Sequence, residues 1–489
     1  MKKSFEGVCL EMKEMLIGKS QTKKVFMLPE MGNRHGIVTG ATGTGKTVTL
    51  QVLAEAFSDR GVPVILLDVK GDLTGLAEPG KPHPKIDERL NFIGIDDYEF
   101  KFYPVVPWDI FGENGIPIRT TVSEMGPLIL GRLLDLNDTQ QGVIEILFKM
   151  ADEENLLLLD LKDLNAVLGH AYENDKTISK EYGLVSKQSI SAIQRKVSRL
   201  SIQGGDLFFG EPALDLFDLL KTDSDGRGKI QLISGQGLFE NPMVYSAMLL
   251  WMISEFYENM PEVGDLEKPQ AVIFIDEAHI LFDEAGNYLL QRMEQVVKLI
   301  RSKGIGLYFI TQNPRDIPED IMSQLGNRIQ HALRAYTPKE RRALKAAADS
   351  FRENPNIDAM EVIPQLGVGE ALVSFLDEKG IPAPVDRVLI RPPQSKIGQA
   401  SSDTVSALLS KKTNLEKYKS PYDRESAYEI LESRMPVASE EKQAKKKGRR
   451  EKNIGMELFE AAGKSAVRSL SSKVGRDIAR GLLGTFFKK

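Results

Sequence analysis

The segment from residue 40 to residue 47 has the composition and spacing of a loop that binds phosphate. It fits the pattern G-x-x-x-x-G-K-[ST] in full. Glycines let consecutive backbone N–H groups turn towards one phosphate without a Cβ clash, and a helix that begins there adds its positive dipole end. The lysine is expected to neutralise the β- and γ-phosphate oxygens, and the last hydroxyl is expected to bind Mg²⁺. The candidate residues for ATP, with Thr47 also on Mg²⁺, are Gly40, Ala41, Thr42, Gly43, Thr44, Gly45, Lys46 and Thr47.

Two adjacent acids follow an apolar stretch much later in the chain. Asp276 and Glu277 come directly after residues 272–275, and neighbouring side chains at a strand end diverge. Asp276 is therefore expected to hold the Mg²⁺ shell through water, while Glu277 is expected to orient and deprotonate the attacking water. The alternative is a helix N-cap followed by a first-turn acid, but the complete phosphate loop in the same chain favours catalysis. For His279, a packed histidine is expected rather than a metal ligand, since no second histidine has the right spacing.

A third polar position follows another apolar stretch. Gln312 comes directly after residues 306–311, and the carboxyl ends of parallel strands face the ligand crevice. Gln312 is therefore expected to contact the γ-phosphate or the attacking water as a sensor, whereas the alternative is a turn before Pro314. Asp68 ends a further apolar stretch, where it could support the site from behind or contact nucleotide or DNA, and a simple loop acid fits equally well.

These positions require a sheet with helices packed against it. Residues 36–39 and 62–68 have the pattern of buried strands on either side of an amphipathic helix at 48–57, and this βαβ unit is typical of a parallel sheet. A strand before the glycines and a helix after them favour the phosphate loop over a chance turn. Further strands are expected at 229–234, 271–275, 306–311, 328–333 and 371–375, and further helices at 242–257, 288–301 and 338–348. The predicted fold class is α/β, with a mainly parallel sheet.

The chain divides by composition into six segments. The predicted segments are a short N-terminal segment (1–35), two parts of a P-loop ATPase core (36–114 and 229–393), a mainly helical insertion (115–228), a polar charged linker (394–455) and a basic amphipathic C-terminal helix (456–489). The insertion follows from helical spacing of apolar residues, and the linker from its polar composition. The last helix could pack on the protein, join subunits or lie on an anionic surface, and packing on protein is the default.

The bulk composition is that of a globular protein. The 489 residues are 42% hydrophobic and 27% charged. No run approaches the roughly 20 apolar residues that cross a bilayer, and no signal-peptide pattern follows the first residue. Cys9 is the only cysteine, so an intrachain disulfide is excluded and a cytoplasmic protein is expected. The net charge of −5 is not basic overall, although residues 440–489 contain 14 Lys and Arg against six Asp and Glu.

The motifs together resemble the HerA/FtsK superfamily of hexameric P-loop motors, and more narrowly the bacterial HerA-like ATPases. The residues that carry the resemblance are Arg34-His35, Gly40–Thr47, Leu67–Asp72, Ile275–His279 and Thr311–Pro314, within about residues 25–392. The resemblance implies a RecA-like sheet, a homo-hexameric ring with ATP sites between subunits, and translocation of double-stranded DNA.

The same resemblance implies an arginine that acts on the ATP of a neighbouring subunit. In HerA-like proteins this arginine precedes the sensor strand, and the matching position is Arg301. A planar, permanently charged guanidinium suits the spread charge of a phosphoryl-transfer transition state. Arg328 and Arg334 are rivals, and an ordinary surface arginine is the alternative.

Two main functions agree with these features. One is a ring-forming DNA translocase or helicase whose contacts with DNA phosphates are independent of sequence. Its candidate contacts are the basic clusters at 194–199, 339–342 and 445–450, although such clusters are more often solvated faces. The alternative is a P-loop ATPase that acts on a protein or membrane-associated partner without DNA. A nucleotide-gated scaffold with little hydrolysis is a third class, and the intact Glu277 argues against it.

Overall fold

The computed structural model describes residues 14–235, 237, 241–264, 266–283, 287–411 and 414–434. The chain forms two compact units, Met1–Ala427 and Tyr428–Lys489. Of the second unit, only residues 428–434 are described, as the continuation of helix α17 (Ala427–Arg434). The predicted C-terminal helix at 456–489 and the last part of the predicted linker, 435–455, lie outside the described residues.

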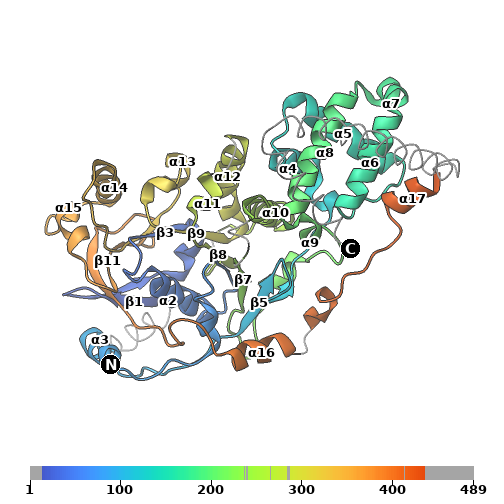
Figure 1. The fold of residues 1–489 in the computed structure, drawn as a ribbon. Coiled ribbons are helices and arrows are strands. Elements are labelled where there is room, and N and C mark those ends of the chain that lie inside the picture. The colour runs from blue at the N-terminus through green and yellow to red at the C-terminus, as the bar shows by residue number, and fades with distance from the viewer. Residues whose placement is uncertain are drawn as a thin grey trace, which may run out of the picture. The chain divides into compact units, whose positions relative to one another are not determined.

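The first unit is built on one large sheet (Figure 1). In spatial order its strands are β2 (Lys24–Met27), β1 (Met15–Lys19), β12 (Asp386–Ile390), β11 (Glu370–Ser374), β10 (Asn327–Gln330), β3 (Gly36–Thr39), β9 (Ile305–Thr311), β8 (Ala271–Ile275), β4 (Val64–Asp68), β7 (Ile230–Ser234), β5 (Val105–Asp109) and β6 (Ile116–Pro117). The strands from β10 to β6 pair in parallel. The four from β2 to β11, and the pair β10–β11, are antiparallel. The predicted α/β fold with a mainly parallel sheet is confirmed.

The centre of the sheet is buried on both faces. Every residue of β4 and β8 is buried, as expected for parallel strands that are covered on both sides. Helix α2 (Lys46–Asp59) packs on one face, where the ring centroids of Phe57 and Tyr308 are 5.8 Å apart. Phe309 points to the other face because side chains alternate along a strand. There it meets Phe282 of helix α11 (His279–Asp283), at 5.8 Å between ring centroids.

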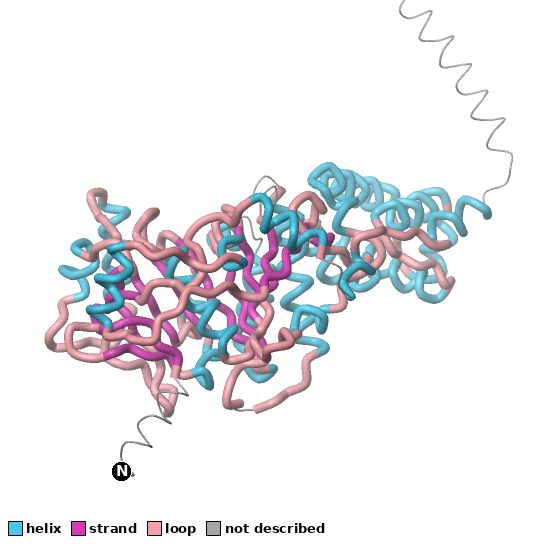
Figure 2. The backbone as a smooth tube through the Cα atoms, turned by 90° about the horizontal axis from the view of Figure 1, so that it is seen from below, coloured by secondary structure: helices cyan, strands magenta, loops and turns pink. Residues whose placement is uncertain are grey.

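A group of helices separates β6 from β7 in the chain. Its members are α4 (Val122–Leu133), α5 (Asp138–Glu153), α6 (Leu161–Glu173), α7 (Asp175–Tyr182), α8 (Lys187–Leu200) and α9 (Asp206–Phe208). They gather beyond the β5 edge of the sheet in Figure 1, and Figure 2 shows this region as mainly cyan helix. Capping boxes at Thr121, Asn137 and Asp160 begin α4, α5 and α6 and satisfy first-turn N–H groups. The helical character predicted for 115–228 agrees with these elements.

The other described helices surround the sheet. They are α3 (Pro84–Ile93), α10 (Pro242–Asn259), α12 (Asn287–Ile300), α13 (Glu319–Met322), α14 (Pro338–Asp349), α15 (Ala359–Val362) and α16 (Ser402–Ser410). The helices expected at 242–257, 288–301 and 338–348 therefore form within two residues of their predicted bounds.

The structure differs from the predicted linker over residues 394–434. This stretch contains α16, a 3₁₀ turn at Asn414–Tyr418 and α17. Its first residues are fixed on α2 by Glu55, whose fully buried carboxylate accepts backbone N–H bonds from Gln394 at 3.0 Å and Ser395 at 2.9 Å. Arg391 completes the arrangement with an ion pair to Glu55 at 3.1 Å. A buried charge needs such partners, so the start of this polar stretch is fixed to the first unit, which extends to Ala427.

Candidate functional site

The phosphate loop follows β3 at the centre of the sheet, and its backbone requires glycine. Gly40, Gly43 and Gly45 have φ values of +148°, +78° and +111°, which L side chains rarely adopt. A Cβ on Gly40 would lie 2.5 Å from the Cβ of His331, and a Cβ on Gly45 would lie 3.1 Å from the backbone nitrogen of Gly369. Apart from Gly43 and its two chain neighbours, no atom of the described residues lies within 4 Å of a Cβ placed on Gly43. The loop is therefore closely backed at both ends and open in the middle.

A buried histidine supports the loop from behind. The ring of His331 contacts the Thr49 hydroxyl at 2.8 Å and the Glu370 carbonyl oxygen at 2.9 Å. Burial lowers the pKa of His331 to about 4, so the ring is neutral near pH 7 and its two nitrogens serve one donor and one acceptor role. Sequence reasoning did not single out His331, because its position is explained only by contacts with distant residues.

The side chain of Lys46 contacts the start of the phosphate loop. Its ammonium group donates to the carbonyl oxygens of Gly40 at 2.6 Å and Ala41 at 3.1 Å. The pKa of Lys46 is lowered, first by burial and also by the charge of Lys70, while Glu277 and Asp276 oppose this shift. The contacts with Gly40 and Ala41 place the ammonium group at the phosphate loop, where a bound phosphate would need a cation.

The two acids lie at the end of β8, beside the loop. Glu277 has a left-handed backbone (φ +47°) and donates its N–H to Asp276 Oδ1 at 2.9 Å. The next residue, Ala278, donates its N–H to the Ile310 carbonyl of β9 at 2.9 Å. These contacts fix the strand end, so the side chains of Asp276 and Glu277 take different directions.

The two carboxyl groups have different electrostatic surroundings. Burial, together with the charge of Glu277, raises the pKa of Asp276 to about 6. Burial alone would also raise the pKa of Glu277. The hydrogen bond from Lys70 and the charge of Lys70 outweigh the effect of burial, so the pKa of Glu277 is lowered. The Lys70 ammonium lies 2.5 Å from Glu277 Oε1. His279 Nδ1 lies 3.4 Å from Glu277 Oε2 but not in hydrogen-bond geometry, so Oε2 is buried without a hydrogen-bond partner among the described residues.

Gln312 and Asp68 occupy the ends of the strands on either side of β8. Gln312 Oε1 accepts a long hydrogen bond from the Thr42 hydroxyl at 3.4 Å, so the end of β9 contacts the phosphate loop directly. Asp68 serves as a loop acid in the structure. Its carboxylate accepts N–H bonds from Gly71, Asp72 and Leu73 at 2.8–3.2 Å and shapes the loop that carries Lys70.

A cavity of about 540 Å³ adjoins the start of α2. It is bordered by Gly45 and Val48 on the loop side, and by Phe100, Val368 and Ile397 among others. This position, next to the loop and with an apolar lining, suits a nucleoside. No sequence motif points to this cavity, because its walls come from four separate stretches of the chain.

Arg301 lies at the opposite end of the sheet from the loop. Arg301 precedes β9, whereas Gln312 follows β9. The strand has seven residues, so its two ends are roughly 23 Å apart at about 3.3 Å per residue. Arg301 borders a basic cavity of about 350 Å³ that Arg34, Lys298, Arg328 and Arg352 also line. The structure therefore does not bring Arg301 together with the loop and the acids of its own chain.

The two rival arginines differ in their surroundings. The guanidinium group of Arg328 donates to the carbonyl oxygens of Leu325 at 3.0 Å, Met322 at 3.2 Å and Ser350, which gives it a structural role within its own subunit. Arg334 is exposed and follows β10, at the end of the sheet where the loop lies.

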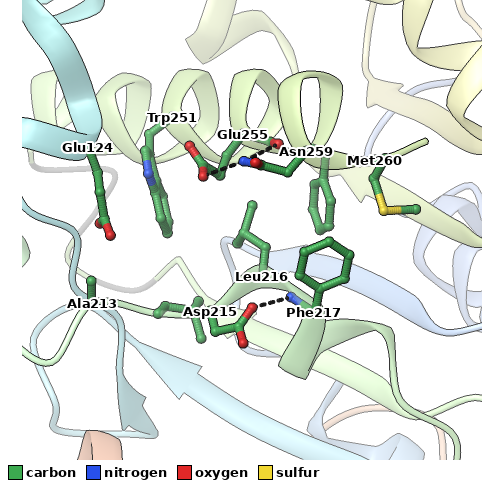
Figure 3. A pocket seen from close by; sticks show the side chains of 11 residues that line it. Glu124, Ala213, Asp215, Leu216, Phe217, Trp251, Glu255, Asn259 and Met260 are labelled. Atoms are coloured by element: carbon green, nitrogen blue, oxygen red, sulfur yellow. Dashed lines mark hydrogen bonds between the residues drawn. The ribbon is translucent and has the colours of Figure 1, made fainter. Parts of the chain in front are cut away.

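A further pocket lies apart from these residues. Figure 3 shows it between α10 and residues 213–217, with Trp251 and Glu255 projecting from the helix. Its volume is about 290 Å³, and it contains none of the predicted site residues. Glu255 accepts a hydrogen bond from the Asn259 amide at 2.6 Å.

The donor set beside the loop fits Mg²⁺ bound together with a nucleotide. In the described part of the chain, no group of three or more His, Cys, Asp or Glu side chains could hold a metal ion. Mg²⁺ keeps several waters and needs only one or two protein oxygens when phosphates supply the rest. Thr47 and Asp276 can provide these oxygens. Among the described helices, none combines the length and apolarity needed to span a membrane.

Comparisons with known proteins agree with this geometry. Residues 13–489 match the family described as helicase HerA-like C-terminal. The chain is 22% identical over 366 residues to a DNA double-strand break repair helicase HerA from Sulfolobus acidocaldarius, covering 73% of this chain and 65% of the relative. It is 24% identical over 376 residues to a probable helicase from Methanocaldococcus jannaschii, covering 73% and 66%. The match thus spans slightly less than two thirds of these relatives.

Solved structures share the fold. The bacterial conjugative coupling protein TrwB in an unbound form has a TM-score of 0.51 and 15% identity, covering 81% of this chain and 94% of TrwB. The plasmid coupling protein TrwB with a non-hydrolysable ATP analogue has a TM-score of 0.52 at the same identity and coverage. At this identity the likeness establishes the fold, which is the RecA-like fold of P-loop ATPases.

Proposed function

Since the chain belongs to the helicase HerA-like C-terminal family, we propose that it is a ring-forming motor that hydrolyses Mg²⁺-ATP to move double-stranded DNA. ATP hydrolysis is supported by the position of the candidate residues at the ends of three neighbouring strands. The loop after β3, the acids after β8 and Gln312 after β9 lie side by side, with Thr42 bonded to Gln312 and Ala278 bonded to β9.

Each group has a distinct part in the proposed reaction. The glycine-lined amides and Lys46 bind the β- and γ-phosphates, and Lys46 offsets the charge that develops during transfer. Thr47 and Asp276 would hold Mg²⁺, which would neutralise negative charge on the phosphates when bound. Glu277 takes a proton from the water that attacks the γ-phosphorus as the bond to the ADP oxygen breaks. Gln312, beside Thr42, orients the γ-phosphate or this water. The adjoining cavity at Gly45 and Val48 receives the nucleoside.

Two observations support movement of DNA: the similarity to relatives that are helicases, and positive charge exposed on two helices. The relatives include HerA helicases, and Lys339, Arg341 and Arg342 are exposed on α14, as Arg195 and Arg199 are on α8. Contacts of this kind bind phosphates without regard to base sequence.

Double-stranded DNA is expected to raise the ATP turnover of the wild-type protein at low salt. Each phosphate contact releases counterions, so the stimulation should fall steeply between about 50 and 200 mM salt. ATPase assays over a DNA titration at several salt concentrations measure this, with particle size determined in the same samples. Turnover that no DNA changes, together with stimulation by a co-purified protein or by anionic liposomes, would favour the alternative ATPase that acts without DNA.

Arg301 is proposed to act on the ATP of a neighbouring subunit. The strand length that separates it from its own site supports this, as does its position in a cavity lined by positive side chains. Arg301→Ala and Lys46→Ala proteins should each be nearly inactive. An equal mixture should regain up to about a quarter of wild-type turnover, because one interface in four pairs an intact loop with an intact arginine in a randomly assembled ring.

The control for this mixture is Arg352→Ala, a change in the same cavity at a side chain that donates to the Pro382 carbonyl oxygen. It should remain active without a partner. Mixed rings that contain both inactive variants by native mass spectrometry, yet regain no turnover, would rule out Arg301 as the trans-acting arginine.

A further inference from the structure

We propose that Lys70 is a positioning residue for Glu277, a role that rests on the proposed ATP hydrolysis at this site. Lys70 comes two residues after the end of β4, and Glu277 two residues after the end of β8. The two strands pair in parallel, with Leu67 opposite Ile275. The register of the sheet therefore places the lysine and the glutamate side by side.

The loop that carries Lys70 is held in one conformation. Three consecutive N–H groups after Lys70 donate to the buried carboxylate of Asp68, and Gly71 takes a left-handed backbone with φ +74°. Such a turn leaves little freedom at its start. The ammonium group of Lys70 is thereby directed at Glu277, although 43% of the Lys70 side chain is exposed.

The contact divides the two oxygens of Glu277 between different tasks. Oε1 lies 2.5 Å from Lys70 Nζ, whereas Oε2 is buried and has no hydrogen-bond partner in the structure. A carboxylate oxygen that is buried without a partner is costly, and it is relieved by a donor such as a water molecule. Lys70 thus fixes the carboxylate by one oxygen and leaves the other to accept the proton of the attacking water.

The other lysine of the site does not perform this task. The ammonium group of Lys46 donates to the carbonyl oxygens of Gly40 and Ala41 within the phosphate loop. The site therefore has two separate cations, one for the phosphates and one for the base. Aligning a general base within hydrogen-bond reach of its water is worth a large rate factor, so loss of Lys70 should affect the chemical step more than binding.

The experiment compares Lys70→Met with Lys70→Arg and a matched control. Lys70→Met should lower kcat at least 10-fold and change KM for ATP by less than about 3-fold, whereas Lys70→Arg should recover most of kcat because it retains the charge and the donors. Lys221→Met is the control, since Lys221 is 44% exposed and pairs with the buried carboxylate of Asp218 outside the site. It should match Lys70→Met in melting temperature and keep wild-type kcat.

A double-mutant cycle shows whether Lys70 acts through Glu277. In single-turnover assays, adding Lys70→Met to Glu277→Gln should cause no further loss of rate, because the carboxylate that Lys70 holds is already gone. An equal additional loss in the Glu277→Gln background, or wild-type kcat in Lys70→Met, overturns the proposal. Lys70→Gln replaces Lys70→Met should the latter fail to fold. A wild-type protein without ATPase activity would instead refute the proposed function.

Discussion

Glu277→Gln is expected to bind ATP with near wild-type affinity and to hydrolyse it at least about 10²-fold more slowly. Glutamine keeps the size of the side chain but cannot take a proton from water. The phosphate loop follows β3 rather than β8, so the substitution should leave its contacts intact. These include the bond from Lys46 to the Gly40 carbonyl oxygen and the bond from the Ala41 N–H to the Ala332 carbonyl oxygen. Single-turnover hydrolysis and equilibrium binding of ATP on the same preparations separate the two effects.

Glu255→Gln is the matched control for this prediction. Glu255 is a partly buried glutamate of α10 that lines the pocket in Figure 3, apart from the phosphate loop. It should hydrolyse ATP at the wild-type rate. A Glu277→Gln protein with wild-type kcat would show that another group activates the water, and the assignment of Glu277 as general base would be wrong.

Lys46→Ala is expected to lose binding and turnover together. Removing the cation withdraws charge from both ground state and transition state, and the loss of a single preorganised electrostatic group costs about 10²–10³-fold in rate. Because a ligand that binds only the folded protein raises its stability, Mg²⁺-ATP should raise the melting temperature of the wild type but not of Lys46→Ala.

The same variant without nucleotide provides the control. Lys46 donates only to carbonyl oxygens of its own loop, so the fold should survive its removal and the nucleotide-free melting temperature should stay close to that of the wild type. If Mg²⁺-ATP shifts the melting temperature of Lys46→Ala as much as that of the wild type, nucleotide binding does not depend on this loop.

The central strands could be predicted because burial on both faces leaves an unmistakable apolar run. The strands at 36–39 and 271–275 have the predicted bounds. β1, β2, β5, β6 and β12 were missed, since they lie towards the sheet edges, where the pattern is only partly apolar. β5 also contains Pro107, which argues against a strand when only the sequence is considered.

In the site, too, contiguous motifs could be predicted from the sequence, whereas contacts between distant residues could not. The phosphate loop and the acids are contiguous motifs, so their strand-end positions could be foreseen. Lys70 belongs to a motif that was recognised, but its contact with Glu277 depends on the register between β4 and β8. The cavity beside Gly45 and the contacts of His331 combine residues far apart in sequence, and no spacing rule connects these.

The anchoring of residues 394–395 on Glu55 has a practical consequence for dividing the chain. The change in composition after Pro393 suggests a natural place to cut, yet a protein that ended there would lack two N–H donors to a carboxylate with no solvent exposure. An internal negative charge stripped of its donors destabilises the helix that bears it, and that helix begins at the phosphate loop. Shortened versions meant to retain nucleotide binding should therefore extend beyond Lys396.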